Sequence, residues 1–155
     1  MKFYIDQSGK IENTNKLTIV AFANGKTKSI KINGREKRKL VTYFRRIAGL
    51  KKIYVYKIFS AMIFLLLKGE RVEYLIIDRE YPGHEGKIKL DLIAFFQKSE
   101  KSLPDISFTL ITKNSPAHKI AIDTFRGKRK ADVVVSSEDV LKLFSNKKGW
   151  RSLAR

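Results

Sequence analysis

The sequence has no cysteine, only two histidines and only three prolines among its 155 residues. Without cysteine there can be no disulfide bond, no thiolate zinc site and no cysteine nucleophile, and two histidines are too few for a histidine-rich metal cage. Acidic residues are also scarce, because 15 Asp and Glu face 33 Lys and Arg and give a formal net charge of +18. So large an excess repels itself unless a polyanion neutralises part of it, so we expect nucleic acid as the partner.

Long hydrophobic runs are absent as well. The most apolar segment, Ile53 to Leu67, contains Lys57 and falls short of the roughly 20 apolar residues that span a bilayer, so it predicts a buried helix. The N-terminus has no apolar signal-peptide core, so we expect a cytoplasmic protein that does not enter a membrane. A hydrophobic content of 43% over this length predicts a single folded domain covering residues 1–155.

The hydrophobic pattern predicts a mixed α/β layer structure that begins with three strands. A tight turn at Asn24-Gly25 joins the second and third strands into a hairpin, and Ser136 with Asp139 forms a capping pattern before the last helix. The predicted strands are Phe3 to Asp6, Leu17 to Ala23, Thr27 to Ile32, Glu73 to Asp78 and Ile106 to Thr112. The predicted helices are Gly34 to Ala48, Val55 to Lys68, Lys87 to Lys98, one beginning at Pro116, and Val140 to Phe144.

The positive charge is unevenly distributed along the chain. Residues 70–105 carry eight acidic and six basic side chains, whereas the segments on both sides are basic. An acidic site inside a basic surface is the arrangement expected where metal ions act on a phosphodiester, although solvated surface carboxylates would give the same pattern. The residues predicted to hold the nucleic-acid strand are Arg45, Arg46, Lys51, Lys52, Lys128, Arg129 and Lys130. The aromatic residues that could stack unpaired bases, and so favour a single-stranded substrate, are Tyr43, Tyr54, Tyr56, Tyr81 and Trp150.

Asp6 and Asp78 each end a strand that is predicted to lie centrally in the sheet. Sites on α/β sheets gather at the carboxyl ends of strands, so two parallel neighbours would bring these carboxylates together. Adjacent carboxylates raise each other's pKa unless a cation neutralises them, which favours a divalent metal. The alternative is that both aspartates only form the turns that follow their strands.

The segment Tyr4-Ile5-Asp6-Gln7-Ser8-Gly9, followed by a hairpin, helices and a strand ending in Ile76-Ile77-Asp78, resembles the RNase H-like nuclease superfamily. The resemblance covers residues 2–126. It implies an RNase H-like mixed sheet flanked by helices. It also implies that Asp6 and Asp78 are metal ligands for Mg²⁺ or Mn²⁺.

Members of this superfamily take a further ligand from a C-terminal helix, where this sequence offers His118 or Asp123. Five residues separate these two side chains by about 140° around a helix, so they cannot both face one site. His118 is favoured because it lies at the edge of the apolar, sheet-facing stripe, and Asp132 remains a further candidate. The glutamate that the family carries on the helix after strand three has only Glu36 as its counterpart, set among basic residues, and Glu85 could substitute for it.

These observations lead to the hypothesis of a metal-dependent nuclease that hydrolyses phosphodiester bonds of DNA or RNA. Asp6 and Asp78 would hold the metal, His118 would complete the site or orient the nucleophile, and Glu85 would assist. The main alternative is a non-catalytic nucleic-acid-binding module on the same scaffold. A basic structural protein of a ribonucleoprotein particle would explain the charge alone.

Overall fold

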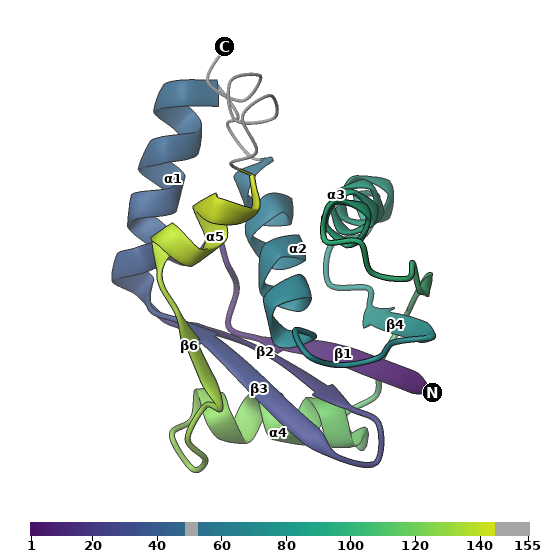
Figure 1. Ribbon diagram of the computed structural model, residues 1–155. Coiled ribbons are helices and arrows are strands. Elements are labelled where there is room, and N and C mark those ends of the chain that lie inside the picture. The colour runs from purple at the N-terminus through teal and green to yellow at the C-terminus, as the bar shows by residue number, and fades with distance from the viewer. Residues whose placement is uncertain (49–52, 145–155) are drawn as a thin grey trace.

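The computed structural model describes residues 1–48 and 53–144, and within them it shows an α/β fold with one six-stranded mixed sheet (Figure 1). The strand order is β5-β4-β1-β2-β3-β6. The strands are β1 (Lys2–Ser8), β2 (Thr18–Ala23), β3 (Thr27–Ile32), β4 (Tyr74–Asp78), β5 (Asp105–Thr109) and β6 (Val133–Val135). The helices are α1 (Gly34–Ala48), α2 (Tyr54–Leu66), α3 (Glu85–Lys98), α4 (Pro116–Phe125) and α5 (Ser137–Leu143).

Strand β2 runs antiparallel to β1 and β3, whereas the pairs β1–β4, β4–β5 and β3–β6 are parallel. The predicted hairpin is confirmed, because Ala23 pairs with Thr27 across a turn in which Gly25 has a φ of 100°. This positive φ is the conformation that glycine adopts at little cost. Since β1 and β3 both run antiparallel to β2, and β4 runs parallel to β1, the carboxyl ends of β1, β3 and β4 lie at the same end of the sheet.

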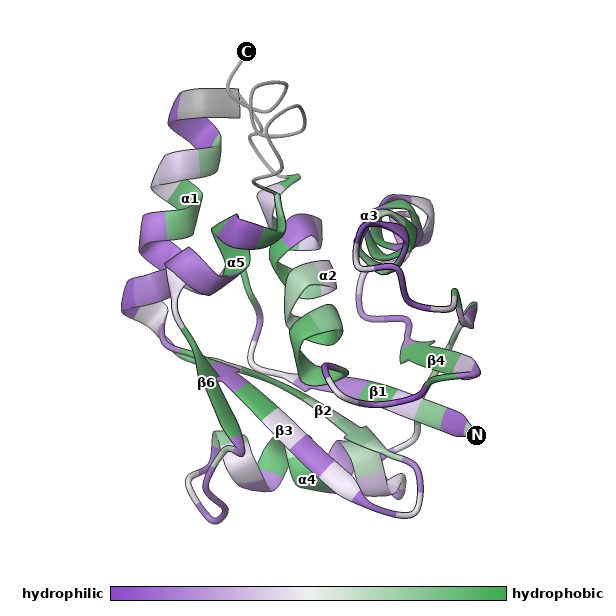
Figure 2. Cartoon of the chain, viewed as in Figure 1, coloured by the Kyte–Doolittle hydropathy of each residue, from purple (hydrophilic) through white to green (hydrophobic). Residues whose placement is uncertain are grey.

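The helices form two unequal layers. Helix α4 lies alone on one face of the sheet and packs on β1, β2 and β3, whereas the other helices lie on the opposite face (Figure 1). The larger core is on that opposite face, where α2 is apolar over nearly its whole surface (Figure 2). Its continuous apolar run is explained by burial against both the sheet and α3. None of the helices in residues 1–48 and 53–144 combines the length and apolar character needed to cross a lipid bilayer.

Strand β6 was not predicted from the sequence. Three consecutive valines, Val133 to Val135, pair in parallel with Ile30, Lys31 and Ile32 of β3 and extend the sheet at its outer edge. A strand of this length has no alternation that sets it apart from a loop, and it is formed by its pairing with a segment about 100 residues away. The capping pattern that follows it is confirmed, because Ser136 and Asp139 form a reciprocal capping box at the start of α5.

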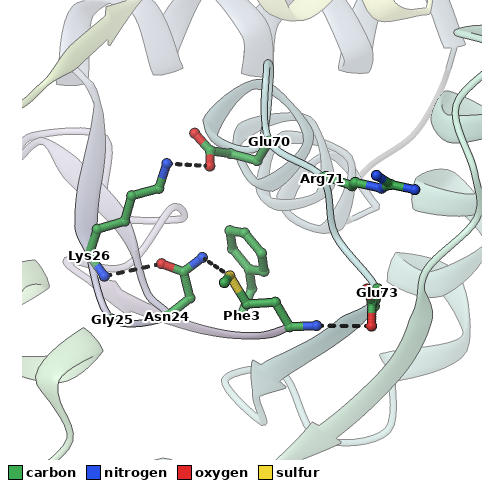
Figure 3. Close-up of a pocket in the computed structure, with 8 residues that line it drawn as sticks. Phe3, Asn24, Gly25, Lys26, Glu70, Arg71 and Glu73 are labelled. Atoms are coloured by element: carbon green, nitrogen blue, oxygen red, sulfur yellow. Dashed lines mark hydrogen bonds and ion pairs between the residues drawn. The ribbon is translucent and has the colours of Figure 1, made fainter.

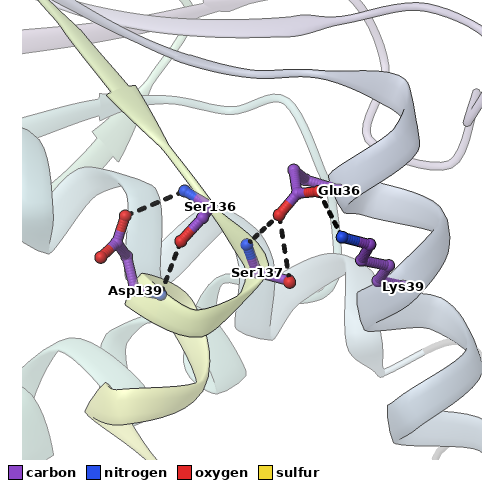
Figure 4. A network of polar contacts seen from close by, with 5 residues as sticks. All are labelled: Glu36, Lys39, Ser136, Ser137 and Asp139. Carbon is purple, nitrogen blue, oxygen red and sulfur yellow. Dashed lines mark hydrogen bonds and ion pairs between the residues drawn. The ribbon is translucent and has the colours of Figure 1, made fainter.

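Glu36 joins helix α1 to the start of α5 (Figure 4). Its Oε1 accepts hydrogen bonds from the backbone N–H of Ser137 at 2.8 Å and from the Ser137 hydroxyl at 3.1 Å. Its Oε2 pairs with Lys39 Nζ at 3.0 Å. The bond from the Ser137 N–H, followed by the one from Lys39, lowers the pKa of Glu36. Glu36 therefore has a structural role between the two helices.

We expect Glu36→Ala to lower the free energy of unfolding by about 1 kcal/mol, because it removes a cap from α5 and leaves the Ser137 N–H without its acceptor. Lys39→Ala is the matched control, since it removes only the exposed ion pair and should cost less than about 0.5 kcal/mol. Urea unfolding followed by circular dichroism measures both values. Equal losses in the two variants would contradict the capping role.

Candidate metal centre

Three carboxylates meet at the carboxyl ends of β1 and β4. Ile5 pairs with Ile77 in the parallel register, so Asp6 and Asp78 follow side by side on their strands. Ile5 and Ile77 belong to the large core, and side chains alternate along a strand, so both aspartates face the α4 side of the sheet. Glu80 follows two residues after Asp78. Each of the three acidic residues offers one oxygen, and these oxygens lie within 4.8 Å of one another.

Asp6 is the most buried member of this acidic cluster, with 3% of its surface exposed. Burial, and beyond it the charge of Asp78, raises the pKa of Asp6 to about 6. Two hydrogen bonds oppose this rise, because the Gln7 backbone N–H donates to Oδ1 at 2.8 Å and His118 Nδ1 lies 2.8 Å from Oδ2. Asp6 is thus fixed in position while its ionised form remains unfavourable in the metal-free protein.

Burial and a neighbouring negative charge also disfavour the ionised form of Glu80. Burial, followed by the charge of neighbouring Asp78, raises the pKa of Glu80 to about 7. Asp78 is held by the Ile111 backbone N–H, which donates to its Oδ1 at 2.7 Å. Three carboxylates this close bind a proton or a cation to relieve their repulsion, and oxygen-only ligands suit Mg²⁺ and Mn²⁺. The donor set therefore fits a divalent cation.

His118 reaches the cluster from the first turn of α4. The sequence predicted it as the third metal ligand, and the structure brings it to Asp6 through the 2.8 Å hydrogen bond. The group that offers metal-ligand atoms close together consists of Asp6, Asp78 and Glu80 among the described residues. An ionised carboxylate only accepts hydrogen bonds, so the proton of a neutral His118 lies on Nδ1. Glu80 is thus the third residue of the acidic cluster, and His118 contacts this cluster through Asp6.

Glu80 was not selected from the sequence, where it was grouped with the solvated acidic surface. The available signal was its spacing, since it lies two residues beyond a strand-ending aspartate. The burial of Glu80, which raises its pKa, depends on the segments that surround this residue in the folded chain.

The other predicted acidic residues lie outside the acidic cluster. Glu85 pairs with Arg79 Nε at 3.3 Å and accepts from the Gly83 N–H at 2.9 Å. Asp132 accepts from the Ser29 N–H at 2.8 Å and so fastens the start of β6 to β3. Asp123 is half-buried in α4. The assisting role predicted for Glu85 therefore has no geometric support, because its carboxylate serves a turn and an ion pair.

Most of the aromatic residues predicted to stack bases pack within the fold instead. Tyr81 contacts Tyr56 and Phe59 edge-on, with ring centroids 5.6 and 5.4 Å apart. Its hydroxyl is hydrogen-bonded to the side chain of buried Gln7, the residue after Asp6, at 2.9 Å. Tyr54 is buried and Tyr43 packs edge-on against Phe44, while Trp150 lies outside the described residues. These contacts explain the tyrosines as packing, and they leave the preference for single strands without support.

The predicted basic residues occupy two exposed regions. Arg45 and Arg46 lie on α1, and the sequence 128–130 forms an exposed turn between α4 and β6, where Arg129 donates to the Thr27 hydroxyl at 3.2 Å. Lys51 and Lys52 lie outside the described residues.

A hollow of about 650 Å³ lies at the opposite end of the sheet, where β1 begins (Figure 3). Phe3 forms part of its wall. Its charged groups are largely paired, since Lys26 Nζ lies 2.8 Å from Glu70 Oε1 and the Met1 amine lies 3.0 Å from Glu73 Oε2. This hollow therefore lacks the unneutralised charge that marks the acidic cluster.

Comparison with protein-family models and with curated protein sequences finds no match to this chain.

Proposed function

We propose that this protein is a metal-dependent nuclease with an RNase H-like fold, which hydrolyses phosphodiester bonds of DNA or RNA and uses Mg²⁺ or Mn²⁺. The observation that carries the proposal is the acidic cluster itself. A protein with a net charge of +18 brings together three mutually repelling carboxylates, one buried and two half-buried, at one end of the sheet. Such a cluster is unfavourable without a cation, and a bound cation attracts phosphate.

The RNase H-like part of the proposal is supported by the order of the elements and by one pairing. The first strand, the hairpin, the helices and the fourth strand follow one another as in the resemblance. The parallel register of β1 and β4 brings together Asp6 and Asp78, the two residues that the resemblance implies as ligands.

In this proposal Asp6, Asp78 and Glu80 bind the metal, which when bound activates water and stabilises the charge on the phosphoryl oxygens. His118 holds the Asp6 carboxylate in one orientation through its Nδ1–H. Ile111 does the same for Asp78 through its backbone N–H.

The test is to incubate the purified protein with labelled single- and double-stranded DNA and RNA in Mn²⁺, Mg²⁺ or EDTA. We expect cleavage with either metal and none in EDTA. Glu80→Gln should reduce the cleavage rate by on the order of 100-fold, because it removes a ligand. Glu85→Gln is the matched control and should stay within about threefold, since its exposed ion pair contributes little.

Two outcomes would reject the proposal. Equal losses in Glu80→Gln and Glu85→Gln would place the activity outside the acidic cluster. Salt-sensitive nucleic-acid binding with no cleavage under any condition would identify a binding module, which is the alternative function that the basic surface supports.

A further inference from the structure

The exposed face of helix α1 carries a row of mostly basic side chains. Helix α1 contains six basic residues and one acidic residue. We define the α1 basic stripe by the residues that line a shallow surface hollow of about 640 Å³ together with Tyr43: Arg35, Arg38, Lys39, Thr42 and Arg46.

Helix geometry places these residues on one side. At 100° per residue the five side chains of the α1 basic stripe fall within an arc of roughly 100°, and they span about 16 Å along the axis. The buried residues Leu40, Val41 and Phe44 lie on the opposite side and belong to the large core. Figure 2 shows the same division, with hydrophilic residues along the outer side of α1 and hydrophobic residues toward α2 and α5.

Only Lys39 of the α1 basic stripe is paired with an acidic residue of the same helix. The one acidic residue of α1, Glu36, is turned toward α5, where it accepts from Ser137 and pairs with Lys39. Arg38 Nη1 donates one hydrogen bond to the Thr14 carbonyl at 2.6 Å, which orients the Arg38 side chain. The other guanidinium N–H groups remain as donors for a ligand. No acidic partner is found for Arg35 or Arg46 among the described residues.

The α1 basic stripe starts at the end of the sheet where the acidic cluster lies. Helix α1 begins two residues after β3, and a Cβ on Gly34 would come within 2.5 Å of the Thr14 carbonyl oxygen, so the helix start packs against the β1–β2 loop. Strands β3 and β1 are two positions apart in the sheet, which is roughly 10 Å. The first turn of α1 and the acidic cluster therefore lie at the same end of the sheet, with the helix on one face and the aspartates on the α4 face. A nucleic-acid strand that contacts both must pass around this end of the sheet.

We propose that the α1 basic stripe binds the sugar-phosphate backbone of the nucleic acid that the acidic cluster cleaves. This inference rests on the proposed function for the identity of the ligand. Three arginines spaced along a rigid helix match phosphates in series, because guanidinium groups bind phosphate in a bidentate manner. Binding is then independent of sequence and strongly dependent on salt.

The experiment measures binding in EDTA by fluorescence anisotropy, so that cleavage plays no part. Labelled DNA and RNA, single- and double-stranded, are titrated with wild type and with Arg35→Gln/Arg38→Gln/Arg46→Gln at about 50 and about 200 mM salt. We expect affinity at the lower salt to fall by about 10- to 100-fold, and the slope of log affinity against log salt to fall by about 2 to 3. The variant Arg35→Gln/Arg46→Gln keeps the Arg38 contact to Thr14. Its slope should change by about two-thirds as much as that of the triple variant.

The matched control is Lys68→Gln/Arg71→Gln/Lys89→Gln, which removes the same charge from exposed positions elsewhere. It should bind within about threefold of wild type, because only the position of the removed charge differs. Equal losses in the control and the stripe variant would overturn the proposal, as would wild type that fails to bind nucleic acid and instead binds vesicles containing phosphatidylserine. Intact stripe-dependent binding without cleavage would reject the nuclease assignment and leave the stripe as the binding surface.

Discussion

Asp6→Asn is expected to abolish metal-dependent cleavage and, in the absence of metal, to make the protein more stable. Loss of a central ligand should lower the cleavage rate by on the order of 100-fold or more. The gain in stability arises because the native state holds Asp6 beside Asp78 with its carboxylate buried, which raises the pKa of Asp6 from 3.8 to about 6. Asparagine is neutral and does not carry this cost.

The sign of the pH dependence follows from that raised pKa. Between about pH 4 and pH 6 the folded wild type keeps a proton that the unfolded chain has already lost, so its free energy of unfolding falls as pH rises. Each unit of pKa difference corresponds to about 1.4 kcal/mol. The stabilising effect of Asp6→Asn is therefore small near pH 4 and fully developed above about pH 6.

The substitution preserves the local hydrogen bonds. The Asn Oδ1 can accept from the Gln7 N–H as Asp6 does, and the amide can donate to His118 once the imidazole adopts its other tautomer. Steric disruption is thus a small effect compared with the removal of charge.

Thermal unfolding in EDTA and in Mn²⁺ measures both effects. In EDTA near pH 7.5 we expect the Tm of Asp6→Asn to exceed that of wild type by about 6 to 12 °C. Mn²⁺ should raise the Tm of wild type and leave the variant unchanged.

Asp91→Asn provides the control, because Asp91 is paired with Lys57 at 3.2 Å and lies outside the acidic cluster. Burial raises the pKa of Asp91 as well, but Asp91→Asn leaves the half-buried Lys57 ammonium without its charged partner. The variant should therefore be no more stable than wild type, and it should keep the Mn²⁺ response. A lower Tm for Asp6→Asn at every pH, or an undiminished Mn²⁺ shift, would contradict a charge-strained metal site.

Local features of the fold could be predicted because their signals are local. The turn at Asn24-Gly25 is set by the dihedral angles of two residues, and the cap at Ser136 is set by a spacing of three. The meeting of Asp6 with Asp78 depends instead on the parallel pairing of β1 with β4. Periodicity does not specify which strands pair, so the resemblance was needed to bring these two residues together.

The features that were missed all depend on contacts between distant segments. The half-burial of Glu80 beside Asp6 and Asp78 depends on the folded chain, and β6 exists through its pairing with β3. His118 was selected by its place on the apolar side of α4, but its partner at the other end of the chain determines whether it binds metal or orients Asp6. The strand ends thus indicate the end of the sheet where Asp6 and Asp78 meet, and tertiary contacts determine which other side chains join them there.

The burial of Lys37 also could not be predicted from the sequence. Lys37 lies in a basic run of the sequence, yet the structure buries it completely. Its Nζ donates to the Lys10 carbonyl at 3.2 Å, to the Asn13 carbonyl at 2.7 Å and to the Thr18 hydroxyl at 3.0 Å. One ammonium group therefore closes the loop between β1 and β2 onto α1.

Lys37→Met should lower the free energy of unfolding by about 2 to 4 kcal/mol. Methionine fills similar space but leaves two carbonyls and a hydroxyl without their charged donor. Lys39→Met is the matched control on the same helix, and with 57% of its side chain exposed the loss should stay below about 0.5 kcal/mol. Urea unfolding of both variants measures the difference, and equal losses would contradict the role of the buried ammonium.

The pH dependence of this loss separates Lys37 from an ordinary packing residue. Burial lowers the pKa of Lys37 from 10.5 to about 8, so between these values the unfolded chain holds a proton that the folded protein has released. The free energy of unfolding of wild type, relative to Lys37→Met, should consequently rise from about pH 8 to about pH 10.5. A difference between the two proteins that stays constant over this range would show that Lys37 acts through its volume alone.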